Sequence, residues 1–343
     1  MPRSASSWVS LAPVIACLLL VARAESDTAR YEELDSLAAA IGHLGRVPTG
    51  ASLLVLSASA GWPGRVGDVV AGYPEDSPIP APSGTDLCYG RWKGPEGRTV
   101  TVTAPLPGCV PRGLPLSTLP GDRASFRLEG LDTLRGAAVA LSSPGMRVDV
   151  LRPDSSSRFS LFTPTEGVYW LEVMAEGGRG PEVTILLPVI CGASPEDAIE
   201  GNLAMGESEA VSREEILSEL NSIRISQGLR PLRQDGGLQA VARGRAVELA
   251  MNGGVEHYSD SGGSVRELLP DGTGFVAENI GRGSGYSEAW SMILISPFHL
   301  LSCLAPSATE IGMGASVQIE PDSWQMVLVQ VLTTGTSASG GNR

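Results

Sequence analysis

Residues 220–254, LNSIRISQGLRPLRQDGGLQAVARGRAVELAMNGG, predict two helices joined by a short turn. The first helix begins at Ser212, because Ser212 and Glu215 have the spacing of a capping box, and Gly228 is placed to end it. The second helix stops at the glycine pair that begins at Gly253. Apolar residues at helical spacing mark the buried faces, and we assign them to a core rather than to a site: Ile216, Leu220, Ile223, Leu238, Val241, Ala242 and Leu249.

Five short segments follow these helices in order: VEHYSD, AENIG, AWSMILISPFH, TEIGMG and WQMVLVQV. They contain His257 and His299, two of the three histidines in the chain, with Glu278 midway between them. Glu278 follows residues of strand character, so its carboxylate would be partly buried and would need a partner such as a neighbouring imidazole. Ser296-Pro297 favours a helix start that puts His299 in a first turn. Two imidazoles and one carboxylate could converge on a single water or metal ion.

From about Ser212 to Leu332, the order of these signals resembles the CAP superfamily (cysteine-rich secretory proteins, antigen 5 and pathogenesis-related proteins) in its compact bacterial form. The resemblance implies an α-β-α sandwich with a cleft lined by a His, Glu, Glu, His tetrad. By position, His257 corresponds to the first histidine, Glu278 to the glutamate before the asparagine, and His299 to the second histidine.

The sequence departs from the family pattern at two positions. The fourth tetrad member would lie about one helical turn after Trp290, where this chain has Ile293. Leu300 stands where bacterial relatives usually carry arginine. Both departures weaken the case for metal-dependent chemistry.

The candidate metal ligands are therefore His257, Glu278 and His299. Three protein ligands would leave a divalent metal such as zinc an open fourth position for water. With one carboxylate fewer than the tetrad, the metal would be weakly held, and histidine protonation would lower its affinity below about pH 6.5.

The first half of the chain predicts an antiparallel β-sandwich over residues 51–191, so the fold class is α+β, with an α-β-α sandwich following. Turn signals such as Pro120-Gly121-Asp122 separate its β-prone segments. Residues 51–191 contain no histidine and their acidic residues are scattered in turns, which favours a structural or recognition module over an independent enzyme. Nine segments carry the strand signal: SLLVLSA, DLCYGRW, RTVTVTA, RASFRL, AAVALSS, MRVDVL, RFSLF, GVYWLEVMA and EVTILLPVI.

The remaining segments complete a domain scheme. Residues 25–50 predict a short helical segment, with Leu34, Leu37, Ala38, Ile41 and Leu44 on one face of a helix from Tyr31 to Leu44. His43, on the same helix, is read as an ordinary surface or boundary residue. Residues 192–211 predict a linker, 212–333 the CAP-like domain, and 334–343 a disordered tail.

The N-terminus predicts export. Residues 1–24 contain Arg3, an apolar run, and the small-residue cleavage pattern Ala22-Arg23-Ala24, which is typical of a secretory signal peptide. We therefore expect a secreted or periplasmic protein with no transmembrane span. The alternative is a lipoprotein anchored through Cys17.

Cleavage after Ala24 would leave four cysteines: Cys88, Cys109, Cys191 and Cys303. In an oxidising compartment we expect disulfides, for which three pairings are possible. For Cys303, which lies in an apolar run, a buried thiol is an alternative to a bridge.

Charge excludes one class of partner and leaves three classes of function. A net charge of −13 supplies no basic surface for nucleic acid. The leading class is a secreted binding module whose cleft recognises an extracytoplasmic lipid, glycan or protein. The second is a metal-assisted hydrolase with Glu278 as general base beside His257 and His299. The third is an envelope structural or interaction protein.

Overall fold

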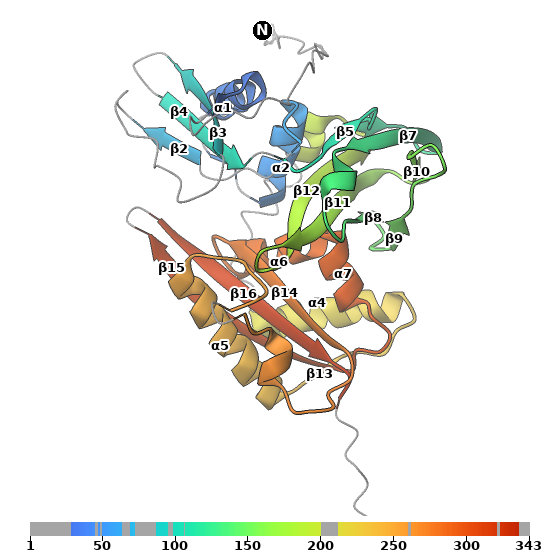
Figure 1. The fold of residues 1–343 in the computed structure, drawn as a ribbon, viewed down its shortest axis with the longest axis vertical. Helices are drawn as coiled ribbons and strands as arrows, with labels where there is room; N and C mark the ends of the chain where they lie inside the picture. The colour runs from blue at the N-terminus through green and yellow to red at the C-terminus, as the bar shows by residue number, and fades with distance from the viewer. Residues whose placement is uncertain are drawn as a thin grey trace, which may run out of the picture.

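The structure, a computed structural model, describes residues 29–44, 47–48, 50–63, 69–72, 87–94, 99–105, 107–199, 212–259, 262–320 and 323–335. The signal peptide, Cys17 and the part of the tail from residue 336 lie outside the described residues, so their assignments stay predictions. Figure 1 shows two halves, with β-rich layers above and the C-terminal layers below.

The N-terminal layer is a helix packed on a small sheet of order β1-β3-β4-β2. Leu34, Leu37, Ala38 and Ile41 of the helix are fully buried as predicted, but Leu44 is 43% exposed, so its assignment to that face is wrong. β1 runs parallel to β3, whereas β3, β4 and β2 pair antiparallel. The elements are β1 (Ala29–Arg30), α1 (Glu32–Leu44), β2 (Val69–Gly72), β3 (Leu87–Lys93) and β4 (Thr99–Pro105).

A β-sandwich follows, with a three-stranded sheet of order β10-β7-β5 and a five-stranded sheet of order β6-β12-β11-β8-β9. Phe126, Leu161, Leu171 and Ile185 belong to one buried cluster that draws on strands of both sheets. Except for the two-residue pair β6–β12, all its strand pairs are antiparallel, as predicted. The strands are β5 (Val110–Arg112), β6 (Ser117–Thr118), β7 (Asp122–Glu129), β8 (Ala138–Ser142), β9 (Val148–Leu151), β10 (Phe159–Thr163), β11 (Gly167–Gly177) and β12 (Gly180–Cys191).

The strand expected at residues 52–58 is wrong, because this segment forms helix α2 (Gly50–Ser59). A short apolar run cannot distinguish a buried strand from a buried helix by its period alone. α2 is apolar nearly all round, and it contributes to three buried clusters. Leu54 and Val55 belong to one, Leu56 to the second and Ala58 to the third. Two further segments assigned to the sandwich, β3 and β4, instead form the separate N-terminal sheet.

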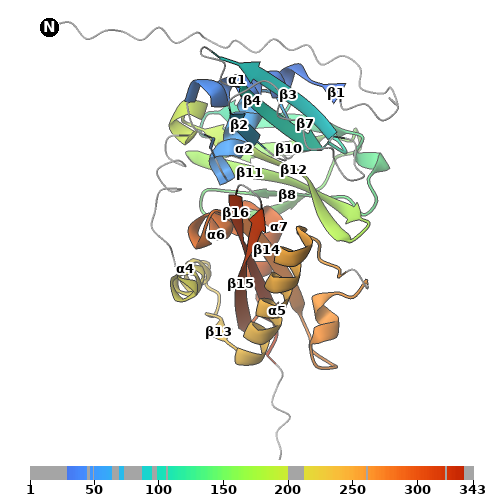
Figure 2. The ribbon, with the colours of Figure 1, turned by 90° about the vertical axis from the view of Figure 1, so that its left-hand side faces the viewer.

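The C-terminal half is an α-β-α sandwich around a sheet of order β13-β15-β16-β14. Helix α5 covers one face, while α4, α6 and α7 share a buried cluster on the other (Figure 2). The predicted capping box at Ser212 and the helix end at Gly253 are confirmed. The elements are α4 (Arg213–Ser226), β13 (Arg233–Gln234), α5 (Gly236–Asn252), β14 (Val276–Gly283), α6 (Tyr286–Ile295), α7 (Pro297–Cys303), β15 (Glu310–Glu320) and β16 (Ser323–Thr333).

Two glycines let α5 lie directly on β15. A Cβ added at Gly312 would stand 2.1 Å from the backbone of Leu238, and one at Gly314 would stand 2.2 Å from the backbone of Arg243. Glycine at both positions leaves the space that this close approach needs.

The expected disulfides are not formed. No disulfide joins any of the four cysteines in the described part of the chain, and each side chain is buried in an apolar cluster. Cys88 and Cys303 lie in two different clusters, while Cys109 and Cys191 share a third. Burial raises the pKa of Cys109 to about 11 and that of Cys303 to about 12, so both thiols stay protonated at neutral pH.

The two halves touch through α2 and the outer face of the five-stranded sheet. Trp170 and Ile190 from the sandwich form a cluster with Leu54 and Val55, against which Met292 of α6 packs. Of the predicted linker, residues 195–199 are helical and residues 200–211 lie outside the description. Among the helices that the structure describes, none has the length and apolar content needed to cross a membrane.

Candidate functional site

Three different elements carry the residues that the sequence singled out. His257 lies in the loop after α5, which begins where Gly253 takes a left-handed conformation (φ 73°). Glu278 is on β14, in register with Val331 of the central strand β16. His299 is in the first turn of α7, where Ser296 caps the helix by accepting a hydrogen bond from the His299 amide.

Glu278 and His257 are in direct contact. His257 Nδ1 lies 2.9 Å from Glu278 Oε2, and because a carboxylate only accepts, the ring nitrogen donates. The side chain of Glu278 is 3% exposed and that of His257 is 21% exposed. This partnership between the buried carboxylate and an imidazole is the one that the sequence predicts.

The sequence reading missed Arg245, the second partner of Glu278. Arg245 Nε donates to Glu278 Oε1 at 2.9 Å, and its other nitrogens donate to Glu248 and to the Glu256 carbonyl. Burial acts to lower the pKa of this guanidinium, but Glu278 and Glu248 outweigh burial and raise it. Arg245 follows Leu238 and Ala242 at helical spacing, and that spacing could have placed it on the buried face.

The His299 side chain makes no hydrogen bond to Glu278. Its Nδ1 is buried and has no hydrogen-bond partner in the described part of the chain. Burial, with a smaller contribution from His257, lowers the pKa of His299 to about 3. The imidazole is therefore neutral at neutral pH.

Asn279 holds the backbone of α7 through a side-chain hydrogen bond. Its amide nitrogen lies 3.3 Å from the His299 carbonyl oxygen and 3.2 Å from Gln330 Oε1, both of which accept hydrogen bonds. It therefore ties α7 to the central strand beneath the cleft.

A cavity of about 460 Å³ brings all three candidate residues together with a wall from the other half of the molecule. His257, Glu278 and His299 line it on one side. Residues of β11 and β12 line it on the other: Glu172, Met174, Pro181 and Val183.

Glu172 is the second functional residue that the sequence reading missed. The acidic residues of the first half were assigned to turns, but Glu172 lies in the middle of β11 and is 0% exposed. Ser296 Oγ donates to its carboxylate at 2.9 Å and the Phe298 amide donates at 2.8 Å. Burial raises the pKa of Glu172 to about 7, against the opposing effect of these hydrogen bonds.

Comparison with known proteins identifies the C-terminal half. Residues 217–331 match the model of the cysteine-rich secretory protein family, CAP. Residues 217–331 form a CAP domain. No curated protein matches the sequence.

Three solved structures resemble the chain. An outer surface protein from Borrelia burgdorferi is 19% identical over 36% of this chain and 95% of that chain, with a TM-score of 0.31. An extracellular SCP-domain protein from Bacillus anthracis is 15% identical over 67% of this chain and 68% of that chain, with a TM-score of 0.29. A cysteine-rich secretory protein from Staphylococcus aureus is 12% identical over 62% of this chain and 75% of that chain, with a TM-score of 0.28.

The position where the family resemblance places the fourth tetrad member is part of the core. Ile293 is fully buried in the cluster beneath α6, and Leu300 is fully buried in the same cluster. Neither side chain is free to act in the cleft.

The residues present do not fit a bound metal. Across the described ranges, no group of three or more His, Cys, Asp or Glu side chains is placed to hold a metal ion. Both oxygens of Glu278 are occupied, one by the guanidinium of Arg245, and that fixed positive charge opposes a cation beside the carboxylate. Metal binding by His257, Glu278 and His299 stays a prediction from sequence.

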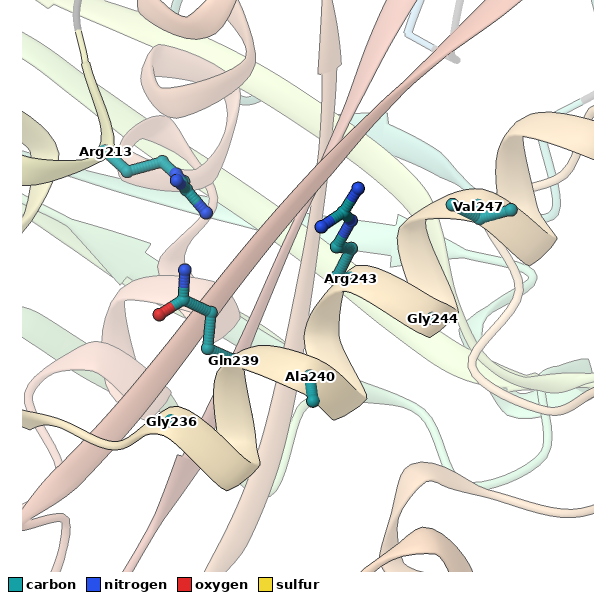
Figure 3. A pocket seen from close by; sticks show the side chains of 7 residues that line it. All are labelled: Arg213, Gly236, Gln239, Ala240, Arg243, Gly244 and Val247. Atoms are coloured by element: carbon teal, nitrogen blue, oxygen red, sulfur yellow. The ribbon is translucent and has the colours of Figure 1, made fainter.

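A second cavity, of about 630 Å³, lies on the outer side of α5 and is separate from the cleft. Figure 3 shows Arg213, Gln239 and Arg243 around it, over the small residues Gly236 and Gly244. None of the described residues that line it is a histidine, an aspartate or a glutamate.

Proposed function

We propose that this chain is an extracytoplasmic binding protein whose ligand occupies the cleft of the CAP domain without being chemically changed. One observation carries the proposal. His257, Glu278 and His299 share a cavity of about 460 Å³, a volume within the usual range for small-molecule sites.

The state of Glu278 favours binding over hydrolysis. A general base needs a carboxylate oxygen that can reach a water or substrate proton. Glu278 has one oxygen bonded to Arg245 and the other to His257, both at 2.9 Å. The carboxylate therefore acts as a structural anion that orients His257.

The cavity wall favours an amphipathic ligand. Met174, Val183, Phe298 and Leu301 supply apolar surface. His257 and several hydroxyl residues supply hydrogen-bonding groups: Tyr258, Ser264 and Ser302. A lipid or glycan with both an alkyl part and a hydroxylated part matches this mixture.

Localisation outside the cytoplasm rests on the sequence of residues 1–24. The basic Arg3, the apolar run and the Ala22-Arg23-Ala24 pattern support cleavage and release.

Nuclear magnetic resonance of the histidine rings tests the proposal directly, because the chain has only three histidines. The full mature chain would be titrated with octyl glucoside, octanoate and N-acetylglucosamine trimer as defined probes. We expect octyl glucoside to shift the signals of His257 and His299 saturably. The signal of His43, which lies on α1 against Trp92, should not move.

The two simpler probes distinguish the ligand classes. A saturable response to octanoate alone would indicate a lipid site, and a response to the trimer alone would indicate a glycan site. Arg243→Ala, on the second cavity, is the matched control and should bind like the parent chain. Absence of saturable shifts with all three probes, or equal shifts at His43, would contradict the proposed function.

A further inference from the structure

The hairpin formed by β11 and β12 touches the loop that carries His257. At its tip, the Tyr258 amide donates to the Arg179 carbonyl at 3.1 Å. Arg179 Nη1 also lies 3.9 Å from Glu256 Oε1. Gly180 has a φ of +104°, and a Cβ added there would stand 3.2 Å from the Cβ of His257.

The same hairpin touches the helix that carries His299. Glu172, in the middle of β11, accepts hydrogen bonds from Ser296 Oγ and from the Phe298 amide. Ser296 Oγ in turn accepts from the His299 amide at 3.3 Å. Figures 1 and 2 both place the hairpin directly against the end of the C-terminal half that holds α7.

The hairpin therefore contacts both histidine-bearing segments. Its tip meets the loop of His257, and its middle meets the first turn of α7. Between these contacts, Met174, Pro181 and Val183 face the cavity. Both contacts come from one pair of strands, with hydrogen bonds along most of their length, so they are held at a fixed separation.

We propose that the β11–β12 hairpin is a permanent wall of the CAP cleft and that Glu172 is the positioning residue through which it fixes His299. If the proposed function holds, both halves of the chain form the ligand site. The position of His299 itself does not depend on a ligand.

A chain of hydrogen bonds connects Glu172 to the first turn of α7. With its proton directed to Glu172, the Ser296 hydroxyl presents a lone pair to the His299 amide. Without Glu172, the Phe298 amide loses its acceptor, and an amide that cannot reach water costs free energy unless it finds another partner. The first turn of α7 would shift to recover one, and His299 would move with it.

The test uses the full mature chain, without ligand, with its three histidine rings labelled. Glu172→Ala should shift the ring signal of His299 and leave that of His43 unchanged. In the parent chain, one oxygen of Glu172 accepts from both Ser296 Oγ and the Phe298 amide. Glu172→Gln keeps an oxygen that can accept both hydrogen bonds, so it should restore the parent position of the His299 signal. Glu176→Ala removes an exposed glutamate from the same strand and should change neither signal.

The outcomes are separable. A folded Glu172→Ala variant with an unchanged His299 signal would overturn the proposal, as would failure of Glu172→Gln to restore a shifted one. If Glu172→Ala does not fold, Glu172→Asp decides, because its shorter side chain cannot keep both contacts and should shift the same signal. The His299 signal could respond to the Glu172 variants as expected while no ligand probe binds. The role of Glu172 would then be supported and the proposed binding function would be wrong.

Discussion

At the scale of single residues, the cleft contains two buried carboxylates in opposite situations. Glu278 has a cationic partner in Arg245. Glu172 has only neutral donors, the Ser296 hydroxyl and the Phe298 amide. This difference makes the two residues respond differently to pH and to substitution.

Glu172 should make the folded chain less stable as pH rises. Its pKa is raised from 4.5 to about 7, so the folded state holds a proton that the unfolded state has released. Between about pH 4.5 and 7 the folded state therefore loses stability with increasing pH, by up to about 3 kcal/mol. Glu172→Gln should remove this dependence. Urea unfolding of both chains at pH 5 and pH 8 measures it, and a difference between the chains that does not grow towards pH 8 would contradict it.

Removing Arg245 should be strongly destabilising, because it leaves Glu278 buried without its charge partner. We expect Arg245→Met to cost about 3–5 kcal/mol in the free energy of unfolding. Arg243→Met, an exposed substitution on the same helix, should cost less than about 0.5 kcal/mol. Urea unfolding of the two variants gives the comparison. Equal stabilities would show that the ion pair does not hold the site together.

Some of these site residues could be predicted from the sequence and others could not. His257, Glu278 and His299 were found because their order along the chain resembles a family pattern, and Arg245 could have been found from helical spacing. Glu172 could not, because alternation along β11 gives two faces but does not say what covers each. The face of β11 that carries Trp170, Glu172 and Met174 packs against the C-terminal half. This contact joins residues far apart in the chain, so the local pattern cannot reveal it.

At the scale of elements, sequence patterns worked where one face of an element is buried. The helix caps at Ser212 and Gly253 follow their local signals. Patterns failed at α2, whose apolar surface is buried nearly all round and so has no polar face to mark its period.

The packing of α5 on β15 gives a paired prediction. Gly312→Ala would place a methyl group into the backbone of Leu238 and should destabilise the chain by about 1–3 kcal/mol or more. Gly244→Ala on the exposed side of the same helix meets no atom within 4 Å. It should stabilise the chain by about 0.5–1 kcal/mol, because alanine favours a helix. Thermal unfolding of the two variants checks the opposite signs, and a stabilising Gly312→Ala would refute the close approach.

At the scale of the whole molecule, the sequence predicted a β-sandwich and an α-β-α sandwich, but not how the two pack together. Sequence separation hides the contacts of α2 with α6 and of β11 with α7, because each pairs residues far apart in the chain. The cleft was consequently predicted as a property of the CAP domain alone, whereas the sandwich forms one of its walls.

Processing of the N-terminus is the remaining whole-chain prediction. If the signal peptide is cleaved after Ala24, protein recovered outside the cytoplasm should begin at Glu25. Intact mass measurement of the exported chain decides. A lipid-modified N-terminus at Cys17 would instead place the protein on a membrane surface.

The burial of α2 has a consequence for biogenesis. Leu54 and Val55 find their partners in β11, β12 and α6, all of which emerge later from the ribosome and the export channel. β11 and β12 precede α6, but until α6 arrives the part of this apolar cluster that Met292 and Ile295 cover stays exposed. A chain halted before α6 should therefore expose apolar surface, aggregate more readily and bind holding chaperones. Synthesis of the last third of the chain would then also protect the first third from aggregation.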